Sequence, residues 1–547
     1  MNQRKLILLA VGAVCAFGAE AVRPHTVYLV QHTHSDIGYA RPQSEIISHY
    51  VEHIDHALDY CEQTKDYPAD AQFRWTCETA GAVLNFIRTR TPEQVARLKY
   101  WIEKGNIEVT GMFLDMGEVC DDATLRHGLR ELRLVHEQGI PIKTLMQNDV
   151  HGIPWCIADF AAEIGIKYTW MGENTDRALV PFKSPTIYRW QSPSGREMLA
   201  FRSEHYMLGN FWGIHNFDEK RFAAKMNAFL DKLDKDGYPF DAFGAPYSGF
   251  ITDDAPPNWQ PCDFIRRWNA AGHSVRLVSA TASMFMDHVT RDPAVVKKLA
   301  VHRAAYPDWW ADGFGTSAME TGEAIKAQRE LLAAEGVFAM SLLRGKSLAA
   351  SVAPLLADTR ENLLYWGEHT MGSHASISDP GRWDSLEGWR SKAAFAWTAQ
   401  RGARFADEAA AAMMLPELAR DPDHVTLTLF NPLPWTRDGF ADLFIDWATI
   451  PNATKMDWGI SPPTPDFRFV DEKGETLLVR GDKAVPWGRG AGRYYRIFAR
   501  NLPPCGYRTY RLEIGGAPAD TKGPAALENE FYRLVIDAKT GTVTSIF

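Results

Sequence analysis

The sequence lacks the concentrated positive charge that several classes of protein need. Its 547 residues include no basic tract, and the net charge is −9. Proteins that bind nucleic acid or an anionic membrane surface gather lysine and arginine on one face. We therefore expect neither partner for this chain.

Cysteine is also scarce, and it is scattered. The cysteines that follow the N-terminal segment include no C-x-x-C pair, so a cysteine-bound metal is not expected at these spacings. Export would permit disulfides, but the spacing assigns no pairing. These cysteines are Cys61, Cys77, Cys120, Cys156, Cys262 and Cys505.

Long apolar runs are absent after the first residues, so we expect no membrane span. The start of the chain, Met1–Ala21, has basic residues at Arg4 and Lys5, an apolar run over Leu6–Phe17 and the small-x-small sequence Ala19-Glu20-Ala21. This pattern predicts a cleavable secretory signal, with an uncleaved anchor as the alternative. The mature protein would then be secreted or periplasmic.

The chain is too long for one ordinary domain. Its pattern predicts a signal peptide over 1–21, a β/α catalytic domain over 22–290, a helical bundle over 291–418 and a β-rich domain over 419–547. The sequence stops inside a strand-like run, which would leave an exposed edge. We therefore expect the last domain to be incomplete at its C-terminus. The sequence predicts no particular oligomeric state.

Strand-like and helical runs alternate from Thr26 to about Val278, which predicts a parallel sheet or an irregular barrel. One helix has a clear start, because Thr91 and Gln94 make a capping box and Pro92 takes the first helical position. Sites in such folds lie at the carboxyl ends of the strands. Several acidic residues fall just past a strand-like run: Asp36, Glu78, Asp115, Asp149 and Asp253.

The pattern changes twice in the second half of the chain. After residue 422 it becomes β-rich, and the last segment, Phe531–Phe547, predicts a hairpin with its turn at Lys539-Thr540-Gly541. Before that, segments rich in alanine, leucine, glutamate and arginine predict a bundle of long helices, at roughly 317–344, 348–366 and 386–413.

The first strand-like run ends in the most informative motif of the chain. Val27–Val30 is followed by His32, His34 and Asp36, and side chains alternate between the two faces of a strand. The two imidazoles and the carboxylate therefore point the same way, as a divalent metal requires. This motif predicts a metal-dependent enzyme.

The run His32-Thr33-His34-Ser35-Asp36-Ile37-Gly38-Tyr39 resembles the H-x-H-x-D-x-G-W signature of glycoside hydrolase family 38, the retaining α-mannosidases. The resemblance implies an irregular parallel β/α barrel of the seven-stranded type, followed by a helical bundle and a C-terminal β-sandwich region. Further segments resemble the family in the same order along the chain. Gly105–Gly111 resembles the strand before its acidic loop, and Asp149 stands where the family carries its nucleophile. Asp253-Asp254 resembles the acid-bearing loop, and Phe430–Trp435 resembles the opening of the β-region.

The resemblance implies one zinc ion, bound by His34, Asp36, Asp149 and His369. Two imidazoles and two carboxylates suit Zn²⁺, whereas Ca²⁺ prefers an all-oxygen shell. His374 competes with His369 as the last of these ligands, because both follow Gly367 in a segment that interrupts the helical pattern.

The resemblance also implies the catalytic residues. Asp149 would attack the anomeric carbon, and Asp253 or Asp254 would protonate the leaving oxygen and later activate water. We prefer Asp253, because it comes first after the strand-like run. Either carboxylate could instead cap the following turn.

The implied partner is a carbohydrate, an α-mannoside or a related glycan. Tyr39 and His32 are the candidate substrate-binding residues. Tyr39 would stack under a sugar ring or close a local core, and His32 would orient a metal ligand or simply be buried. Glu78 would bind hydroxyls, or pair with Arg74 or Arg126.

The sequence departs from the family pattern in two places. Asp149 is followed by Val150-His151-Gly152-Ile153-Pro154 instead of P-F-G-H-S, and Thr370 stands where an aspartate usually follows the late histidine. These departures predict a distant branch, so the family alone does not identify the substrate.

Two other functions stay open. A metal-dependent deacetylase or amidohydrolase also begins with His-x-His after a first barrel strand, and it needs more histidines at later strand ends. His151, His205 and His215 are the candidates for that role. A glycan-binding relative without turnover is the third hypothesis, because the sequence after Asp149 is altered.

Overall fold

The computed structural model describes residues 24–117, 119–150, 152–174, 182, 184–306, 312–415, 418, 424–446, 467–485, 492–515 and 526–547. The predicted signal segment lies outside these residues. The chain divides into two compact units. The first contains the described residues up to Glu330 together with Ala353–Arg404, and the second contains those of Leu331–Val352 and Phe405–Phe547. The domain limits predicted near residues 290 and 418 stay a prediction.

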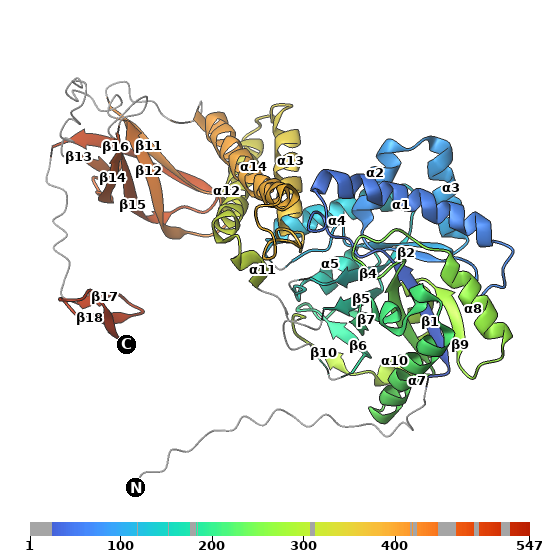
Figure 1. Cartoon of the computed structure of the whole chain (residues 1–547). Coiled ribbons are helices and arrows are strands. Elements are labelled where there is room, and N and C mark those ends of the chain that lie inside the picture. The colour runs from blue at the N-terminus through green and yellow to red at the C-terminus, as the bar shows by residue number, and fades with distance from the viewer. Residues whose placement is uncertain are drawn as a thin grey trace, which may run out of the picture. The chain divides into compact units, whose positions relative to one another are not determined.

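The first unit is built on a ten-stranded sheet (Figure 1). Its central strands are parallel, and within the described residues they are β1 (Thr26–His32), β2 (Trp75–Cys77), β3 (Ile107–Gly111), β4 (Ile142–Asn148), β5 (Tyr168–Glu173), β7 (Glu197–His205) and β8 (Ala242–Ser248). They pair in the order β7-β5-β4-β3-β2-β1-β8. Since β7 and β8 also lie in contact, the sheet is barrel-like, which confirms the predicted irregular barrel.

Three further strands make the barrel irregular, and the sequence pattern does not predict them. β9 (Arg276–Ala280) pairs with β1 over Thr26–Val30, so β2 reaches β1 only at His32. β6 (Thr186–Gln191) runs antiparallel to β7, and β10 (Val301–His302) extends the sheet beyond β6.

Helices pack on the sheet through one apolar face. In α4 (Asp122–Glu137), Leu125, Leu129 and Leu132 follow helical spacing and are buried. α3 (Pro92–Glu103) begins with the predicted capping box, in which Thr91 Oγ1 accepts a hydrogen bond from the Gln94 N–H and Gln94 Oε1 accepts one from the Thr91 N–H. The other helices of this part are α1 (Gln43–Thr64), α2 (Ala80–Thr89), α5 (Ile157–Glu163), α6 (Leu208–Trp212), α7 (Glu219–Lys235), α8 (Gln260–Ala270), α9 (Ala282–Val289), α10 (Pro293–Lys298) and the 3₁₀ turn η1 (Ile214–Asn216).

The three long helices predicted after the barrel are confirmed as α12 (Ala318–Leu343), α13 (Val352–Gly367) and α14 (Trp383–Met414), with a short α11 (Asp312–Gly315) before them. Among the described residues, no helix combines the length and apolar character that a membrane crossing needs.

The second unit contains small antiparallel sheets. Phe469, Ile497 and Leu512 come from two of them and are buried in a shared apolar core, as the predicted sandwich requires. One sheet joins β11 (Thr426–Asn431), β16 (Gly506–Ile514) and β13 (Phe467–Val470), and the other joins β12 (Arg437–Asp446), β15 (Gly492–Leu502) and β14 (Leu478–Val485). The predicted terminal hairpin is β18 (Arg533–Ile536) and β19 (Val543–Ile546), with β17 (Ala526–Glu528) beside it.

The loop after β8 is held against the end of β1, and it carries both candidate acids. The Thr33 hydroxyl donates a 2.8 Å hydrogen bond to the Ala255 carbonyl. Gly249 lets this loop close, because a Cβ there would lie 2.0 Å from the Pro256 carbonyl oxygen. Any side chain at position 249 would therefore push the loop out of place.

Replacing Gly249 by alanine should destabilise the protein. The overlap is with backbone rather than with a flexible side chain, so we expect Gly249→Ala to lower the free energy of unfolding by about 1–3 kcal/mol. Gly322→Ala is the matched control, because a Cβ there meets nothing within 4 Å. Chemical denaturation of both variants measures the difference. Equal stability of the two variants would contradict this account of the loop.

Candidate active site

The end of β1 brings the polar residues of the first motif to the carboxyl end of the barrel. His32 is the last residue of β1, and His34 and Asp36 follow it. All three side chains are buried, although histidine is only moderately often buried and aspartate is mostly exposed. Such burial requires partners that satisfy their charge and hydrogen bonds.

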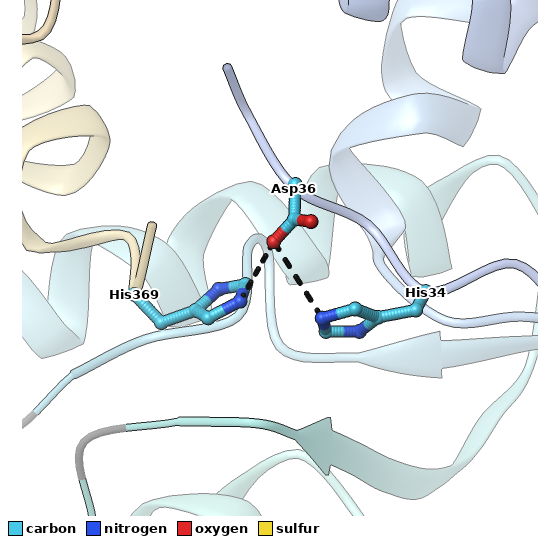
Figure 2. A group of neighbouring side chains, drawn as sticks. All are labelled: His34, Asp36 and His369. Atoms are coloured by element: carbon cyan, nitrogen blue, oxygen red, sulfur yellow. Dashed lines mark ion pairs between the residues drawn. The ribbon is translucent and has the colours of Figure 1, made fainter. Parts of the chain in front are cut away.

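Asp36 lies between two imidazoles (Figure 2). Its Oδ1 is 3.0 Å from Nε2 of His369 and 3.6 Å from Nε2 of His34. His369 belongs to the segment between α13 and α14, and its backbone N–H donates to the Asp115 carbonyl at 2.8 Å. Two distant parts of the sequence therefore meet at one carboxylate.

Asp149, the fourth predicted metal ligand, lies beside His34. It follows β4, and its Oδ2 lies 3.8 Å from Nε2 of His34. Its φ of 51° is in the left-handed region, which residues other than glycine seldom adopt. Its N–H donates to the Gly172 carbonyl at 3.1 Å. The neighbouring strand β5 thus helps to hold Asp149 in this conformation.

His374, the alternative to His369, does not join the cluster. Its imidazole is exposed, with Nδ1 3.1 Å from the Tyr39 carbonyl oxygen and Nε2 3.2 Å from an Arg382 guanidinium nitrogen. Of the two histidines, only His369 lies beside Asp36.

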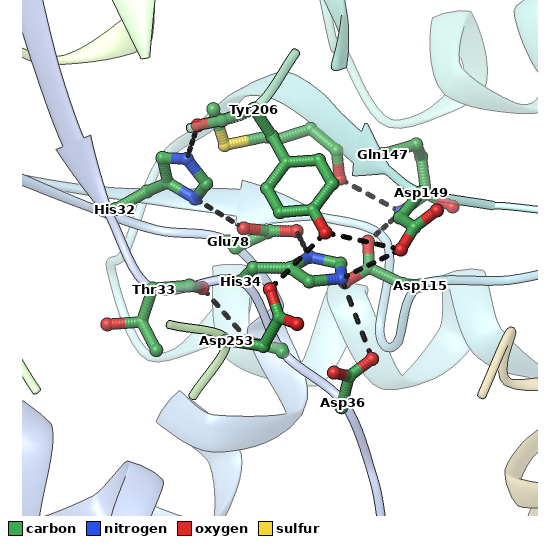
Figure 3. A network of polar contacts seen from close by, with 12 residues as sticks. His32, Thr33, His34, Asp36, Glu78, Asp115, Gln147, Asp149, Tyr206 and Asp253 are labelled. Atoms are coloured by element: carbon green, nitrogen blue, oxygen red, sulfur yellow. Dashed lines mark hydrogen bonds and ion pairs between the residues drawn. The ribbon is translucent and has the colours of Figure 1, made fainter. Parts of the chain in front are cut away.

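A buried glutamate lies behind the two histidines of the first motif (Figure 3). Glu78 Oε2 is 2.6 Å from Nδ1 of His32, and its Oε1 is 2.9 Å from Nδ1 of His34. A carboxylate at Nδ1 keeps a proton on that nitrogen. This leaves Nε2 of His34 facing Asp36 and Asp149. Neither predicted arginine partner is found near Glu78 in the described contacts: Arg74 donates to backbone carbonyls, and Arg126 pairs with other carboxylates.

The two residues predicted to bind substrate take different positions. His32 is fully buried, and its Nε2 lies 2.9 Å from the Tyr206 carbonyl oxygen, so the protein already contacts both ring nitrogens. This position fits the orienting role, and it does not support contact with a sugar. Tyr39 is partly exposed, and its ring centroid lies 6.4 Å from that of His374. Stacking of Tyr39 on a sugar ring stays a prediction.

Asp254 is held by structural contacts. Its Oδ1 accepts hydrogen bonds from the Asp36 N–H, at 3.1 Å, and from the Tyr50 hydroxyl. Its own N–H donates to the His34 carbonyl at 3.1 Å. Asp254 therefore ties the loop after β8 to the segment after β1.

Asp253 instead faces the cluster through a tyrosine. The Tyr206 hydroxyl lies 3.3 Å from Oδ1 of Asp253 and 3.4 Å from Oδ2 of Asp149 (Figure 3). Burial raises the pKa of the Tyr206 phenol, and the charges of Asp149 and Asp253 raise it further, so the phenol keeps its proton. One hydroxyl thus links the two carboxylates of the predicted nucleophile and acid.

The cluster favours positive charge. Burial lowers the pKa of both imidazoles, but the surrounding carboxylates outweigh burial. Glu78 and Asp36 hold the pKa of His34 well above its ordinary value, and Glu368 and Asp36 do the same for His369. A cluster that stabilises protons on two buried imidazoles also stabilises a metal cation in their place.

Asp253 has the electrostatic surroundings of an acid. Its pKa is raised to about 6, first by burial and then by the charge of Asp36, while His34 opposes the shift. A carboxyl group that keeps its proton close to neutral pH can donate it to a leaving group.

The donor atoms fit a metal ion. Within the described residues, ligand atoms of His34, Asp36 and His369 lie within 4.8 Å of one another. Nε2 of His34 is buried and has no hydrogen-bond partner there, a condition that a metal bond would relieve. His34, Glu78 and Asp115 form a second group of this kind. The first group fits better, because imidazoles already bind both oxygens of Glu78.

Of the three histidines that a deacetylase would need, His205 and His215 are described, and both have contacts outside the cluster. His151 lies outside the described residues. Nδ1 of His205 accepts a hydrogen bond from the Met207 N–H at 3.0 Å, and His215 lies near Arg221. Neither histidine belongs to a group of described residues that could hold a metal.

Within the described residues, a barrel-like sheet carries buried histidines and carboxylates at its carboxyl end, an arrangement that is compatible with a bound metal. Residues 24–311 match the model of the glycosyl hydrolases family 38 N-terminal domain. Because this match covers more than half of the 547 residues, the chain belongs to glycosyl hydrolase family 38.

Solved structures agree with the fold. An alpha-mannosidase from Enterococcus faecalis V583 superposes with a TM-score of 0.65 at 16% identity, over 95% of this chain and 61% of that one. A second family 38 protein from Enterococcus faecalis gives a TM-score of 0.56 at 14% identity, over 96% and 60%. This chain therefore spans about 60% of the length of either protein. A search of curated proteins gave no match.

Sequence reasoning missed Tyr206 and Lys392. Tyr206 is the first residue after β7, but the strand-like run in the sequence, Met198–Phe201, ends before it, so the rule that finds Asp149 at a strand end does not find Tyr206. The sequence does not indicate that Lys392 is buried, because a lysine within a helix is usually on the solvent face.

Removing the Asp254 side chain should destabilise the protein, whereas removing that of Asp253 should not. Asp254→Ala leaves the Asp36 N–H and the Tyr50 hydroxyl without their acceptor, so we expect a loss of about 1–3 kcal/mol in unfolding free energy. Asp253→Ala loses one long hydrogen bond and should cost less than about 1 kcal/mol. Denaturant titration compares them, and the reverse order would show that the two roles are misassigned.

Proposed function

We propose that this family 38 protein is an exported, zinc-dependent retaining glycoside hydrolase that acts on α-mannosides or related glycans. The observation that carries the proposal is the convergence of His34, Asp36 and His369, with Asp149 3.8 Å from His34 and linked to Asp253 through Tyr206. The family membership and the fold shared with an alpha-mannosidase support the substrate class.

The proposed zinc ligands are His34 and His369 through Nε2, together with the carboxylates of Asp36 and Asp149. This mixture of nitrogen and oxygen donors suits Zn²⁺, and two carboxylates balance its charge. When bound, zinc would supply a Lewis acid that holds adjacent sugar hydroxyls.

In the first chemical step, a carboxylate oxygen of Asp149 forms a bond to the anomeric carbon while the bond to the leaving oxygen breaks. Asp253 gives its proton to that oxygen. In the second step, Asp253 takes a proton from water, the water oxygen attacks the anomeric carbon, and Asp149 is released. The shared Tyr206 hydroxyl is compatible with the separation of about 5–5.5 Å that retaining enzymes use.

Metal removal and loss of Asp149 should each abolish turnover. We expect a chelator to stop hydrolysis of an aryl α-mannoside and Zn²⁺ to restore it. We expect Asp149→Ala to lower kcat by at least about 10³-fold, because the nucleophile is lost. Released phenolate and metal content per chain are the measurements. Binding of mannosides by the zinc-loaded wild type without any hydrolysis would favour a glycan-binding role instead.

The pH profile should report Asp253. The first step needs its protonated form, so kcat/KM should fall as the pH rises above about 6, where this carboxyl loses its proton. Asp253→Asn should remove this limb and slow the cleavage of substrates with poor leaving groups by about 10²–10⁴-fold. Activated aryl substrates need less protonation and should lose less rate. The matched control Asp254→Asn should keep the limb, and transfer of the effect to Asp254 would overturn the assignment.

A further inference from the structure

A lysine is buried beside the candidate metal centre. Lys392 of α14 is 1% exposed, and its Nζ lies 2.8 Å from the Tyr365 carbonyl, 2.9 Å from the Glu368 carbonyl and 3.0 Å from Glu368 Oε2. An ammonium group carries three N–H donors, and here each has an acceptor. Lysine is almost never fully buried without such pairing, so this arrangement is a built ion pair.

The other oxygen of the same glutamate reaches His369. Glu368 Oε1 lies 2.8 Å from Nδ1 of His369 and 2.7 Å from the Thr370 hydroxyl. A carboxylate at Nδ1 keeps the proton on that nitrogen, so Nε2, which lies 3.0 Å from Asp36, is the ring nitrogen left to bind a metal. Glu368 therefore joins Lys392 on one side to a predicted metal ligand on the other.

The same design occurs on the opposite side of Asp36. His34 has Glu78 at its Nδ1, and the second oxygen of Glu78 contacts His32 (Figure 3). Each imidazole beside Asp36 thus contacts a buried glutamate. The second oxygen of that glutamate contacts another nitrogen group, which is His32 for Glu78 and Lys392 for Glu368. Burial would raise the pKa of Glu368, but the charge of Lys392 and then that of His369 hold it below its ordinary value.

We propose that Lys392 and Glu368 are positioning residues of the metal centre: Lys392 fixes the Glu368 carboxylate, and that carboxylate presents Nε2 of His369 to the metal. This inference rests on the proposed zinc site. The competing explanation is that the ion pair only attaches α14 to the segment after α13. The two explanations differ in what happens when both charges are removed together.

The experiment compares the full chain with Lys392→Met, Glu368→Gln and the double variant. Glu108→Gln is the control, because Glu108 is a buried glutamate whose contacts are with Thr144 and Ser283. Each protein is stripped of metal, and its Zn²⁺ affinity is measured by competition with a chromophoric chelator. Thermal unfolding of the apo proteins gives stability, and the visible spectrum of the Co²⁺-loaded proteins reports on the ligand field.

Lys392→Met leaves a buried carboxylate without its cation, so both stability and Zn²⁺ affinity should fall. The double variant removes both charges, so its stability should recover toward the wild type. Its Zn²⁺ affinity should remain about 10–100-fold weaker, with an altered Co²⁺ spectrum, because His369 is no longer oriented. Glu368→Gln, the most conservative variant, should show the same loss of affinity, and Glu108→Gln should bind as the wild type does.

Wild-type affinity in both Glu368→Gln and the double variant would overturn the positioning role. Failure of the wild type to bind Zn²⁺ would instead overturn the proposed function, so the two failures are distinguishable. If the double variant does not fold, Glu368→Gln alone decides the question through its Zn²⁺ affinity and its Co²⁺ spectrum.

Discussion

The arrangement of this site depends on one buried carboxylate held between two imidazoles. Asp36 lies 3.0 Å from His369 and 3.6 Å from His34, in an interior where an isolated charge would be very costly. Burial raises the pKa of Asp36, but the two imidazoles and the Thr370 hydroxyl outweigh it and lower that pKa. Because the carboxylate needs both histidines, it joins the segment after β1 to the segment between α13 and α14. A bound cation would stabilise the negative charge of Asp36 in the same way.

The barrel brings the residues around Asp36 together at one edge of its sheet. Parallel strands end at the same edge, so the residues just past β1, β4, β7 and β8 come together there. Close backbone contacts fix their directions. Gly249 allows the loop with Asp253 and Asp254 to close on itself, and Gly172 accepts the N–H of Asp149 while its lack of a Cβ leaves room for Asn148. The side chains that follow these strands face one another, and Glu78 and Glu368 contact the imidazoles of His34 and His369 from behind.

Much of this could be predicted from local pattern. The apolar run before His32 predicts β1, and the rule that sites follow parallel strands finds Asp36, Glu78, Asp149 and Asp253. The helices were equally accessible, as the capping box at Thr91 illustrates. Choices between neighbours were harder, because they depend on tertiary contacts. His369 and His374 lie in the same segment, but only His369 lies beside Asp36. Asp253 contacts Tyr206, whereas Asp254 contacts Tyr50. The burial of Lys392 could not be predicted, since nothing in the sequence of its helix distinguishes it from a surface lysine.

The most direct test of the central claim is a crystal structure of the zinc-loaded protein with anomalous data on both sides of the zinc absorption edge. The account predicts one strong zinc peak bonded to Nε2 of His34, Nε2 of His369 and carboxylate oxygens of Asp36 and Asp149, at the distances of about 2.0–2.2 Å that such bonds have. Zinc bound only elsewhere, or no peak between the two imidazoles when the protein is saturated with metal, would contradict it.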